Sequence, residues 1–275
     1  MLQLSVCIEL IFSDREVVER LDGVADADCP AFEFWGWQDK PLDAIAARMD
    51  SQGLVLANMN LDPLVSLVEQ GDVDSFVAGV RESCGVANRL NCQRLATPVE
   101  NVNWGPGQPW YAYLAGRETR DLWKRNRDTV VEGLKRAATV AEGEGIVLLL
   151  EPLNTVVDHH GYFISSSQQA VDILQEVDSP NVKMLFDAYH QQITEGNLIV
   201  NLTENIDLVG HIHIADVPGR HEPGTGEINF FNLLTAAKQA GYDGYVGLEY
   251  VPRAGSMNSL ASTKELLDAV NREAD

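Results

Sequence analysis

Four side chains that could bind a metal ion stand where apolar runs of the sequence end. They are Glu151 after GIVLLL, Asp187 after NVKMLF, His213 in LVGHIHIAD and Glu249 after YVGL. A carboxylate at the end of a buried run is unfavourable unless it is paired, hydrogen-bonded or bound to metal. Two Glu, one Asp and one His form an oxygen-rich ligand set that suits Mg²⁺ or Mn²⁺. The pattern therefore predicts one divalent-metal site in the second half of the chain.

The histidines gather in the same region, because all six lie between residues 159 and 221. His211 and His213 are two residues apart, so on a strand they would point to the same face. His213 is nearer the strand end and is the expected ligand. His211 would lie deeper, either supporting that ligand or packed in the core. His190 follows Asp187 by three residues and could donate a hydrogen bond to a substrate oxygen.

A loop rich in turn residues, ADVPGRHEPGTGEINF, follows His213 directly. It carries Arg220 and Glu222. An arginine can bind a carboxylate through two parallel hydrogen bonds, and we predict that Arg220 and Glu222 contact the substrate. The alternative is a surface ion pair between these two side chains.

Eight apolar runs, several of them continuous as in strands buried on both faces, alternate with amphipathic stretches. The expected strands cover 4–10, 31–36, 53–59, 89–96, 145–151, 182–187, 208–214 and 245–249. Helical spacing of apolar residues is clear over 118–143, 165–177 and 229–240. The serines that open the second of these stretches are suited to capping a helix.

This alternation predicts an α/β fold: one domain, residues 1–275, built as an eight-stranded parallel TIM barrel. The length fits, since such barrels have about 250 residues. The carboxyl ends of the strands would then bring the four predicted ligands to one rim. An open doubly wound sheet is the alternative, but no GxGxxG follows the first strand.

The net charge of −21 argues against nucleic acid or an anionic membrane as partner, since both require basic patches. The acids are dispersed, and only six lysines accompany fourteen arginines. This composition resembles that of halophilic proteins, in which salt screens the self-repulsion. No apolar run reaches the roughly 20 residues that a membrane span needs. The N-terminus reads as a strand rather than a signal peptide, so we expect a cytoplasmic protein.

The cysteines and one long irregular segment match no known sequence motif. The four cysteines form no CxxC pair and are expected to be reduced, buried thiols. Residues 97–117 are irregular and rich in aromatic side chains. They could form a lid or a subunit contact, so a homo-oligomer is one possibility.

Several segments closely resemble the hydroxypyruvate isomerase family, which belongs to the xylose-isomerase-like barrel superfamily. They are EPLN, FDAYH, HIHIAD followed by PGRHEPGTGEINF, and GLEY. In the first third of the chain, LSVCIELIF, AFEFWGW and LNCQRLATP resemble the first, second and fourth strands of that family. The resemblance covers nearly the whole chain, and RHEPGTGEIN is its most family-specific segment.

The resemblance implies a barrel of eight strands and eight helices, a divalent metal, and interconversion of hydroxypyruvate with tartronate semialdehyde through an enediolate. Glu151 and Glu249 match the acid–base pair, and His190 and Arg220 match positions that contact substrate in related epimerases. The positions that match the metal ligands are Glu151, Asp187, His213 and Glu249. Isomerases of the family often carry Gln at the position of His213, whereas epimerases more often carry His. The EPGTGEIN loop favours the isomerases.

Other functions remain open at this stage. A ketose 3-epimerase or a 2-oxo-tetronate isomerase would differ in substrate length, and Phe34, Trp35 and Trp37 could shape that end of the pocket or form a buried aromatic cluster. A DNA-repair endonuclease of the superfamily uses three zinc ions, but this chain has no histidine before residue 159. A non-catalytic sugar-acid binding protein would have no need to hold one divalent ion per chain.

The acidic composition makes a testable prediction. Because salt screens repulsion among dispersed carboxylates, the unfolding temperature should rise from low to molar KCl. Thermal unfolding followed by circular dichroism measures this. An unfolding temperature that stays the same throughout the series would contradict a halophilic adaptation.

Overall fold

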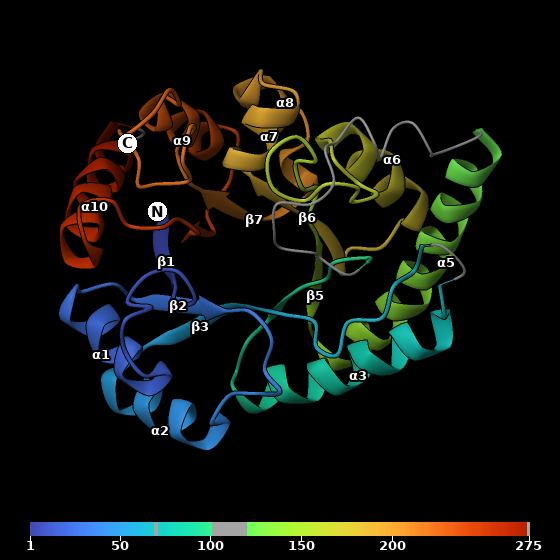
Figure 1. The fold of residues 1–275 in the computed structure, drawn as a ribbon, viewed down its shortest axis with the longest axis horizontal. Coiled ribbons are helices and arrows are strands. Elements are labelled where there is room, and N and C mark those ends of the chain that lie inside the picture. The colour runs from blue at the N-terminus through green and yellow to red at the C-terminus, as the bar shows by residue number, and fades with distance from the viewer. Residues whose placement is uncertain (69–70, 101–119, 274–275) are drawn as a thin grey trace.

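Eight parallel strands close into a barrel in sequence order, from β1 to β8, with β8 pairing back to β1 (Figure 1). The computed structural model describes residues 1–68, 71–100 and 120–273. The strands are β1 (Gln3–Cys7), β2 (Ala31–Phe34), β3 (Val55–Asn60), β4 (Arg94–Ala96), β5 (Val147–Leu150), β6 (Val182–Asp187), β7 (Val209–Ile214) and β8 (Tyr245–Leu248). The predicted TIM barrel is therefore confirmed.

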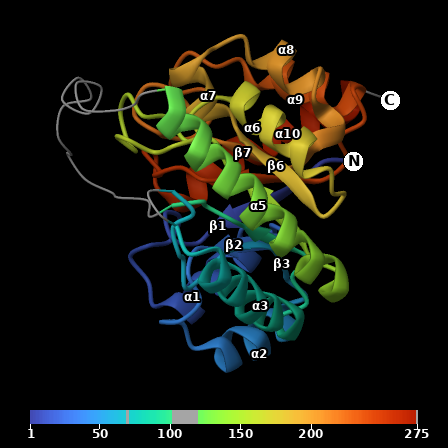
Figure 2. The same ribbon diagram turned by 90° about the vertical axis from the view of Figure 1, so that its right-hand side faces the viewer.

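Helices surround the barrel on the outside (Figure 1). They are α1 (Val17–Asp26), α2 (Leu42–Gln52), α3 (Val73–Arg89), α5 (Arg120–Glu144), α6 (Ser167–Val177), α7 (Ala188–Thr194), α8 (Leu198–Thr203), α9 (Phe230–Gln239) and α10 (Ser256–Glu273). Figure 2 shows α3 and α5 side by side across one flank. In the described part of the chain, no helix is both long and apolar enough to span a bilayer.

The helix starts follow local sequence. At the beginning of α6, Ser166 accepts a hydrogen bond from the backbone of Gln169, and the Gln169 side chain bonds back to the backbone of Ser166. This reciprocal capping box satisfies backbone donors that the first helical turn leaves open. The serine run therefore caps a helix as predicted.

All the predicted strands except 182–187 are longer than the observed ones, and the first and the fourth show why. Residues 8–10 were expected to extend the first strand, but the chain turns there, and the backbone N–H of Ile11 donates to the carbonyl of Cys7 at 3.0 Å. The fourth strand was expected to begin at residue 89, but α3 continues to that residue, and Asn91 adopts a left-handed φ of 54° before the strand starts. Within the predicted irregular stretch 97–117, residues 101–117 lie outside the described residues.

Successive side chains of each strand point alternately toward the surrounding helices and into the barrel, so the sheet has two buried faces. The outer face, against the helices, is apolar and includes Phe32, Phe34, Ile212 and Ile214. The residues between them are polar: Glu33 in β2, and His211 and His213 in β7. Across the barrel, Ala96, Leu149 and Leu185 form a separate small apolar cluster. The interior of the barrel is therefore apolar on the side of β4 to β6 and polar on the side of β2 and β7.

All four cysteines are buried and unpaired, as expected. Burial raises the pKa of Cys29 and Cys84 to about 11 and that of Cys92 to about 12. These thiols are therefore protonated near neutral pH, and they serve as small apolar core residues.

Candidate active site

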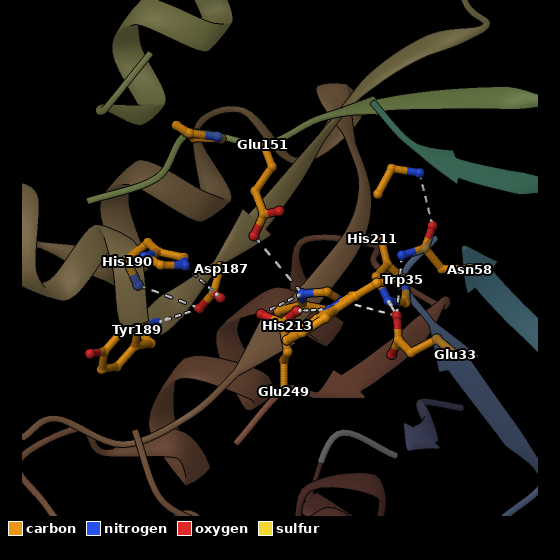
Figure 3. A network of polar contacts seen from close by, with 12 residues as sticks. Glu33, Trp35, Asn58, Glu151, Asp187, Tyr189, His190, His211, His213 and Glu249 are labelled. Carbon is orange, nitrogen blue, oxygen red and sulfur yellow. Dashed lines mark hydrogen bonds and ion pairs between the residues drawn. The ribbon is translucent and has the colours of Figure 1, made fainter. Parts of the chain in front are cut away.

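The four predicted metal ligands meet at the carboxyl end of the barrel (Figure 3). Glu151 follows β5, Asp187 ends β6, His213 lies near the end of β7, and Glu249 follows β8. Carboxylate oxygens of Glu151, Asp187 and Glu249 and a ring nitrogen of His190 lie within 4.8 Å of one another. The Nδ1 atom of His213 lies 4.0 Å from Glu151 Oε1 and 3.6 Å from Glu249 Oε2. The structure thus brings all four side chains into one cluster.

Three polar atoms of this cluster are buried with no hydrogen-bond partner among the residues that the structure describes. They are Glu151 Oε1, Asp187 Oδ2 and His213 Nδ1. Burying such groups without partners is unfavourable. Acceptors from several strands that face one another therefore fit a divalent cation, and their oxygen-rich chemistry suits Mg²⁺ or Mn²⁺.

Burial and neighbouring charges move the carboxyl pKa values of the cluster in opposite directions. Burial, with the charge of Glu249, raises the pKa of Glu151 well above its ordinary value. Burial also raises the pKa of Asp187 to about 6. At Glu249 the effect of burial is outweighed by Arg220 and His213, so its pKa lies well below the ordinary value. A cation that enters the cluster near neutral pH would displace the proton that Glu151 retains.

Glu249 is held by donors from two distant segments. The indole Nε1–H of Trp35, which follows β2, donates to Glu249 Oε1 at 2.9 Å. Arg220 Nη2 donates to Glu249 Oε2 at 2.5 Å. Glu249 therefore has a fixed orientation before any ligand binds.

Trp35 is also the member of the predicted aromatic set that reaches the cluster. Phe34 packs in the core, and the Trp37 indole N–H donates to Ser83. The set therefore divides: Trp35 borders the cluster, whereas Phe34 and Trp37 are structural.

His190 is oriented by Asn154, a residue that the sequence did not single out. The Oδ1 atom of Asn154 accepts from the backbone of Val157 and Asp158, which directs its Nδ2 toward His190 Nδ1 at 2.7 Å. The backbone N–H of Asn154 also donates to His190 Nδ1, at 3.3 Å. Burial, assisted by Arg220, lowers the His190 pKa well below its ordinary value. A neutral imidazole that accepts at Nδ1 carries its proton on Nε2, and this nitrogen lies 3.6 Å from Asp187 Oδ2.

Glu33 is a buried carboxylate beside the cluster that the sequence-based prediction missed. Its Oε2 lies 2.9 Å from His213 Nε2 and 3.2 Å from His211 Nε2. The charges of these histidines outweigh the effect of burial and lower the Glu33 pKa. Glu33 stands inside the apolar run AFEF and not at its end, so the criterion that identified Glu151 did not select it.

The loop after β7 is built around Asp216, whose side chain is fully buried. Its Oδ2 accepts from the backbone N–H groups of Gly224 and Gly226, at 2.9 and 2.8 Å. Its Oδ1 accepts from Val217 and Ile228, at 2.9 and 3.1 Å. A Cβ atom at Gly226 would lie 2.0 Å from the Val217 carbonyl oxygen, so this close approach requires glycine.

This loop places Arg220 over the cluster. Arg220 has a left-handed φ of 55° and is held by backbone bonds at both ends: its N–H donates to Asp216, and its carbonyl accepts from Val251. The guanidinium lies 5.1 Å from the Tyr189 ring centroid as well as against Glu249. Arg220 is thus both strained and fixed, which is common at functional sites.

Glu222 lies on the same loop but makes different contacts. Its carboxylate oxygens accept from the backbone N–H groups of Arg253 and Ala254, at 2.7 and 2.9 Å. The alternative ion pair with Arg220 is not among its contacts in the described part of the chain, where Arg220 pairs with Glu249. In this structure Glu222 fixes the segment after β8.

Sequence comparison gives matches over most of the chain. The family described as xylose isomerase-like TIM barrel matches residues 21–272. The 2-oxo-tetronate isomerase of Cupriavidus necator is 33% identical over 263 residues, covering 94% of this chain and 96% of that protein. The hydroxypyruvate isomerase of Escherichia coli is 29% identical over 265 residues, covering 92% of this chain and 95% of that protein.

A solved structure shares the whole architecture. It is described as an AP endonuclease, family 2, from Brucella melitensis, and it superposes with a TM-score of 0.85 at 28% identity. The superposition covers 96% of this chain and 99% of that chain. The likeness therefore extends over nearly the whole chain.

The role of Asp216 can be tested by limited trypsin digestion. Asp216→Asn leaves one side-chain acceptor for four backbone donors, and each buried N–H left unpaired costs about 1–3 kcal/mol. We expect the loop to loosen and the bond after Arg220, which is 8% exposed, to be cleaved much faster. Asp207→Asn, a change at an exposed carboxylate, should leave the digestion pattern unchanged. Equal resistance of Asp216→Asn and the unmodified protein would contradict this role.

Proposed function

The chain belongs to the xylose isomerase-like TIM barrel family, and we propose that it is a divalent-metal-dependent isomerase that interconverts hydroxypyruvate and tartronate semialdehyde. The observation that carries the proposal is the cluster at the barrel rim. In it, Glu151 and Glu249 reach His213 from two sides (Figure 3). A cluster of this kind has both the ligands and the proton-transfer groups that such an isomerisation needs.

The metal would be held by the four rim side chains, Glu151, Asp187, His213 and Glu249. When bound, a divalent ion polarises substrate oxygens as a Lewis acid. Asp187 is already oriented, because its Oδ1 caps α7 by accepting from Tyr189 at 2.7 Å, and its Oδ2 faces the cluster. Mg²⁺ and Mn²⁺ both fit this oxygen-rich set.

Glu151 and Glu249 are the proposed acid–base pair. One carboxylate takes the proton from C3 of hydroxypyruvate, which gives an enediolate, and a proton is then delivered to C2. The hydroxyl on C3 loses its proton and becomes the aldehyde oxygen, while the carbonyl oxygen on C2 gains a proton and becomes a hydroxyl. One carbon is oxidised and its neighbour reduced, so the reaction needs no external oxidant. Two carboxylates on different sides of the site can serve the two carbons, and assistance of this kind contributes roughly 10²–10⁴ in rate.

His190 and Arg220 are the proposed substrate contacts. A neutral His190 with its proton on Nε2 can donate to a substrate oxygen. Arg220 has five N–H donors in a planar fork, so it can hold Glu249 and bind a substrate carboxylate on another edge. Glu222 would act on the substrate indirectly, by fixing the segment after Glu249.

A longer 2-oxo acid sugar is the second candidate substrate. The specific support is the Cupriavidus necator relative, a 2-oxo-tetronate isomerase that matches nearly from end to end. Both substrates combine a carboxylate with adjacent oxygen-bearing carbons, so the same four ligands and acid–base pair would serve either. Parallel assays with hydroxypyruvate, 2-oxo-tetronate and common ketoses distinguish these activities from a ketose 3-epimerase.

The description of the Brucella melitensis protein suggests phosphodiester cleavage as another activity, but this activity is less well supported. The chain carries a net charge of −21, and nucleic acid binding depends on basic surfaces. We therefore favour a small hydroxy-oxo acid as substrate, and a cytoplasmic location follows from that metabolic role.

Metal binding can be measured directly. Isothermal titration with Mn²⁺ should show about one ion per chain, and saturating Mn²⁺ should raise the unfolding temperature, because ligand at 100 times Kd stabilises by about 2.7 kcal/mol. Asp187→Asn keeps the oxygen that caps α7 but loses a ligand charge, so it should abolish the shift. Asp243→Asn, exposed before β8, is the matched control. Absence of Mn²⁺ binding by the unmodified protein would refute the metal site.

The acid–base pair predicts the effect of two substitutions. Glu151→Gln and Glu249→Gln should each reduce turnover of hydroxypyruvate by at least about 10²-fold, with the far-ultraviolet circular dichroism unchanged. Glu227→Gln, at an exposed position of the β7–α9 loop, should retain normal turnover. Near-normal activity in either of the first two variants would exclude the two-glutamate mechanism.

A further inference from the structure

We propose that Glu33 is a positioning residue that fixes which nitrogen of His213 is presented to the metal. The inference rests on the proposed function, since it takes His213 to be a ligand. Glu33 comes from β2 and His213 from β7, so the two residues reach each other across the interior of the barrel (Figure 3).

The contact between them is a short bond between buried groups. Glu33 is 2% exposed and His213 is 4% exposed. With Glu33 Oε2 at 2.9 Å from His213 Nε2, the imidazole donates at Nε2. Its other nitrogen, Nδ1, points toward Glu249 and Glu151. A carboxylate that accepts the distal N–H of a ligating histidine fixes its tautomer and makes the ligand nitrogen more basic.

The neighbouring strand leaves space for this pair. Gly247 in β8 stands beside His213 in the sheet register. A Cβ atom at Gly247 would lie 2.3 Å from Glu33 Oε1 and 2.4 Å from His213 Cδ2. Any other residue would therefore push the two side chains apart. The glycine at this position is an independent sign that the barrel is built around the Glu33–His213 contact.

Glu33 is itself fixed from two other sides. Asn58 Nδ2 donates to its Oε2 at 3.2 Å, and Asn58 Oδ1 accepts from the backbone N–H of Ala96 at 3.1 Å, which sets the orientation of the amide. His211 Nε2 lies 3.2 Å from the same oxygen. His211 and Asn58 therefore fix the orientation of the Glu33 carboxylate, and this carboxylate fixes the orientation of the His213 ring.

The first test compares Mn²⁺ affinity in matched variants by isothermal titration. Glu33→Gln removes the negative charge beside His213 Nε2 and should bind Mn²⁺ about 10–100-fold more weakly, the loss typical of substitutions at such a partner. Ser5→Ala, a change at a fully buried side chain of β1 that makes no hydrogen bond to Glu33 in the described part of the chain, should stay within about threefold of the unmodified protein. A loss of Mn²⁺ affinity in Glu33→Gln alone would support the positioning role of Glu33, because a general disturbance of the barrel interior would lower the affinity of both variants.

The outcomes separate this inference from the proposed function. If the unmodified protein fails to bind Mn²⁺, both the metal site and the role of Glu33 are contradicted. If the unmodified protein binds and Glu33→Gln binds equally well, or if both variants weaken equally, only the role of Glu33 is overturned.

A second measurement tests the role of Glu33 without a substitution at that residue, so it applies even if Glu33→Gln fails to fold. Long-range ¹H–¹⁵N spectra of the Mg²⁺-saturated protein report which ring nitrogen of each histidine carries the proton. The His213 signals are identified by their loss in His213→Gln. A proton on Nε2 is the expected result, whereas a proton on Nδ1 would overturn the inference.

Discussion

The constraint on which the site depends is the burial of several carboxylates at one end of a barrel. Glu33, Asp187 and Glu249 are each at most 6% exposed, and Glu151 is close beside them. Like charges so close together in a poorly solvated space repel strongly unless they are protonated or matched by cations. The protein places Arg220 and His213 among them and still leaves Glu151 Oε1 and Asp187 Oδ2 without a hydrogen-bond partner in the described part of the chain. We propose that a divalent cation balances the negative charge that these side chains leave unmatched.

This constraint explains features that lie outside the cluster. The glycine at position 247 admits the Glu33–His213 contact, and the glycine at position 226 admits the tight turn around Asp216. Asp216 uses its carboxylate only on backbone donors, so its charge organises the loop that carries Arg220. The rim is thus supported by a layer of residues that touch no substrate but determine where the ligands and the guanidinium lie.

The sequence predicted the barrel and the four side chains that meet at its rim because both leave local signals. Apolar runs mark the strands, and an acid at the end of such a run, as at Glu151, marks the rim. It did not predict that Glu33 belongs to the site, because that carboxylate meets His213 only once β2 and β7 face each other across the closed barrel. The sequence also did not predict that Arg220 pairs with Glu249 rather than Glu222. This pairing depends on a left-handed turn at Arg220 and on a residue that lies 29 positions further along the chain. Residues 89–93 and 8–10 were assigned to strands because composition does not show where a helix or a turn replaces a strand.

The central claim is that carboxylates of this chain move a proton between adjacent carbons. The most direct measurement is isomerisation of hydroxypyruvate in D₂O with Mg²⁺, followed by ¹H and ¹³C spectroscopy. A proton taken up by a side chain that exchanges with solvent returns as deuterium, so the account predicts tartronate semialdehyde labelled at the carbon next to the carboxylate. Product that forms at the enzymatic rate without deuterium at that carbon would indicate direct hydrogen transfer and would contradict the account.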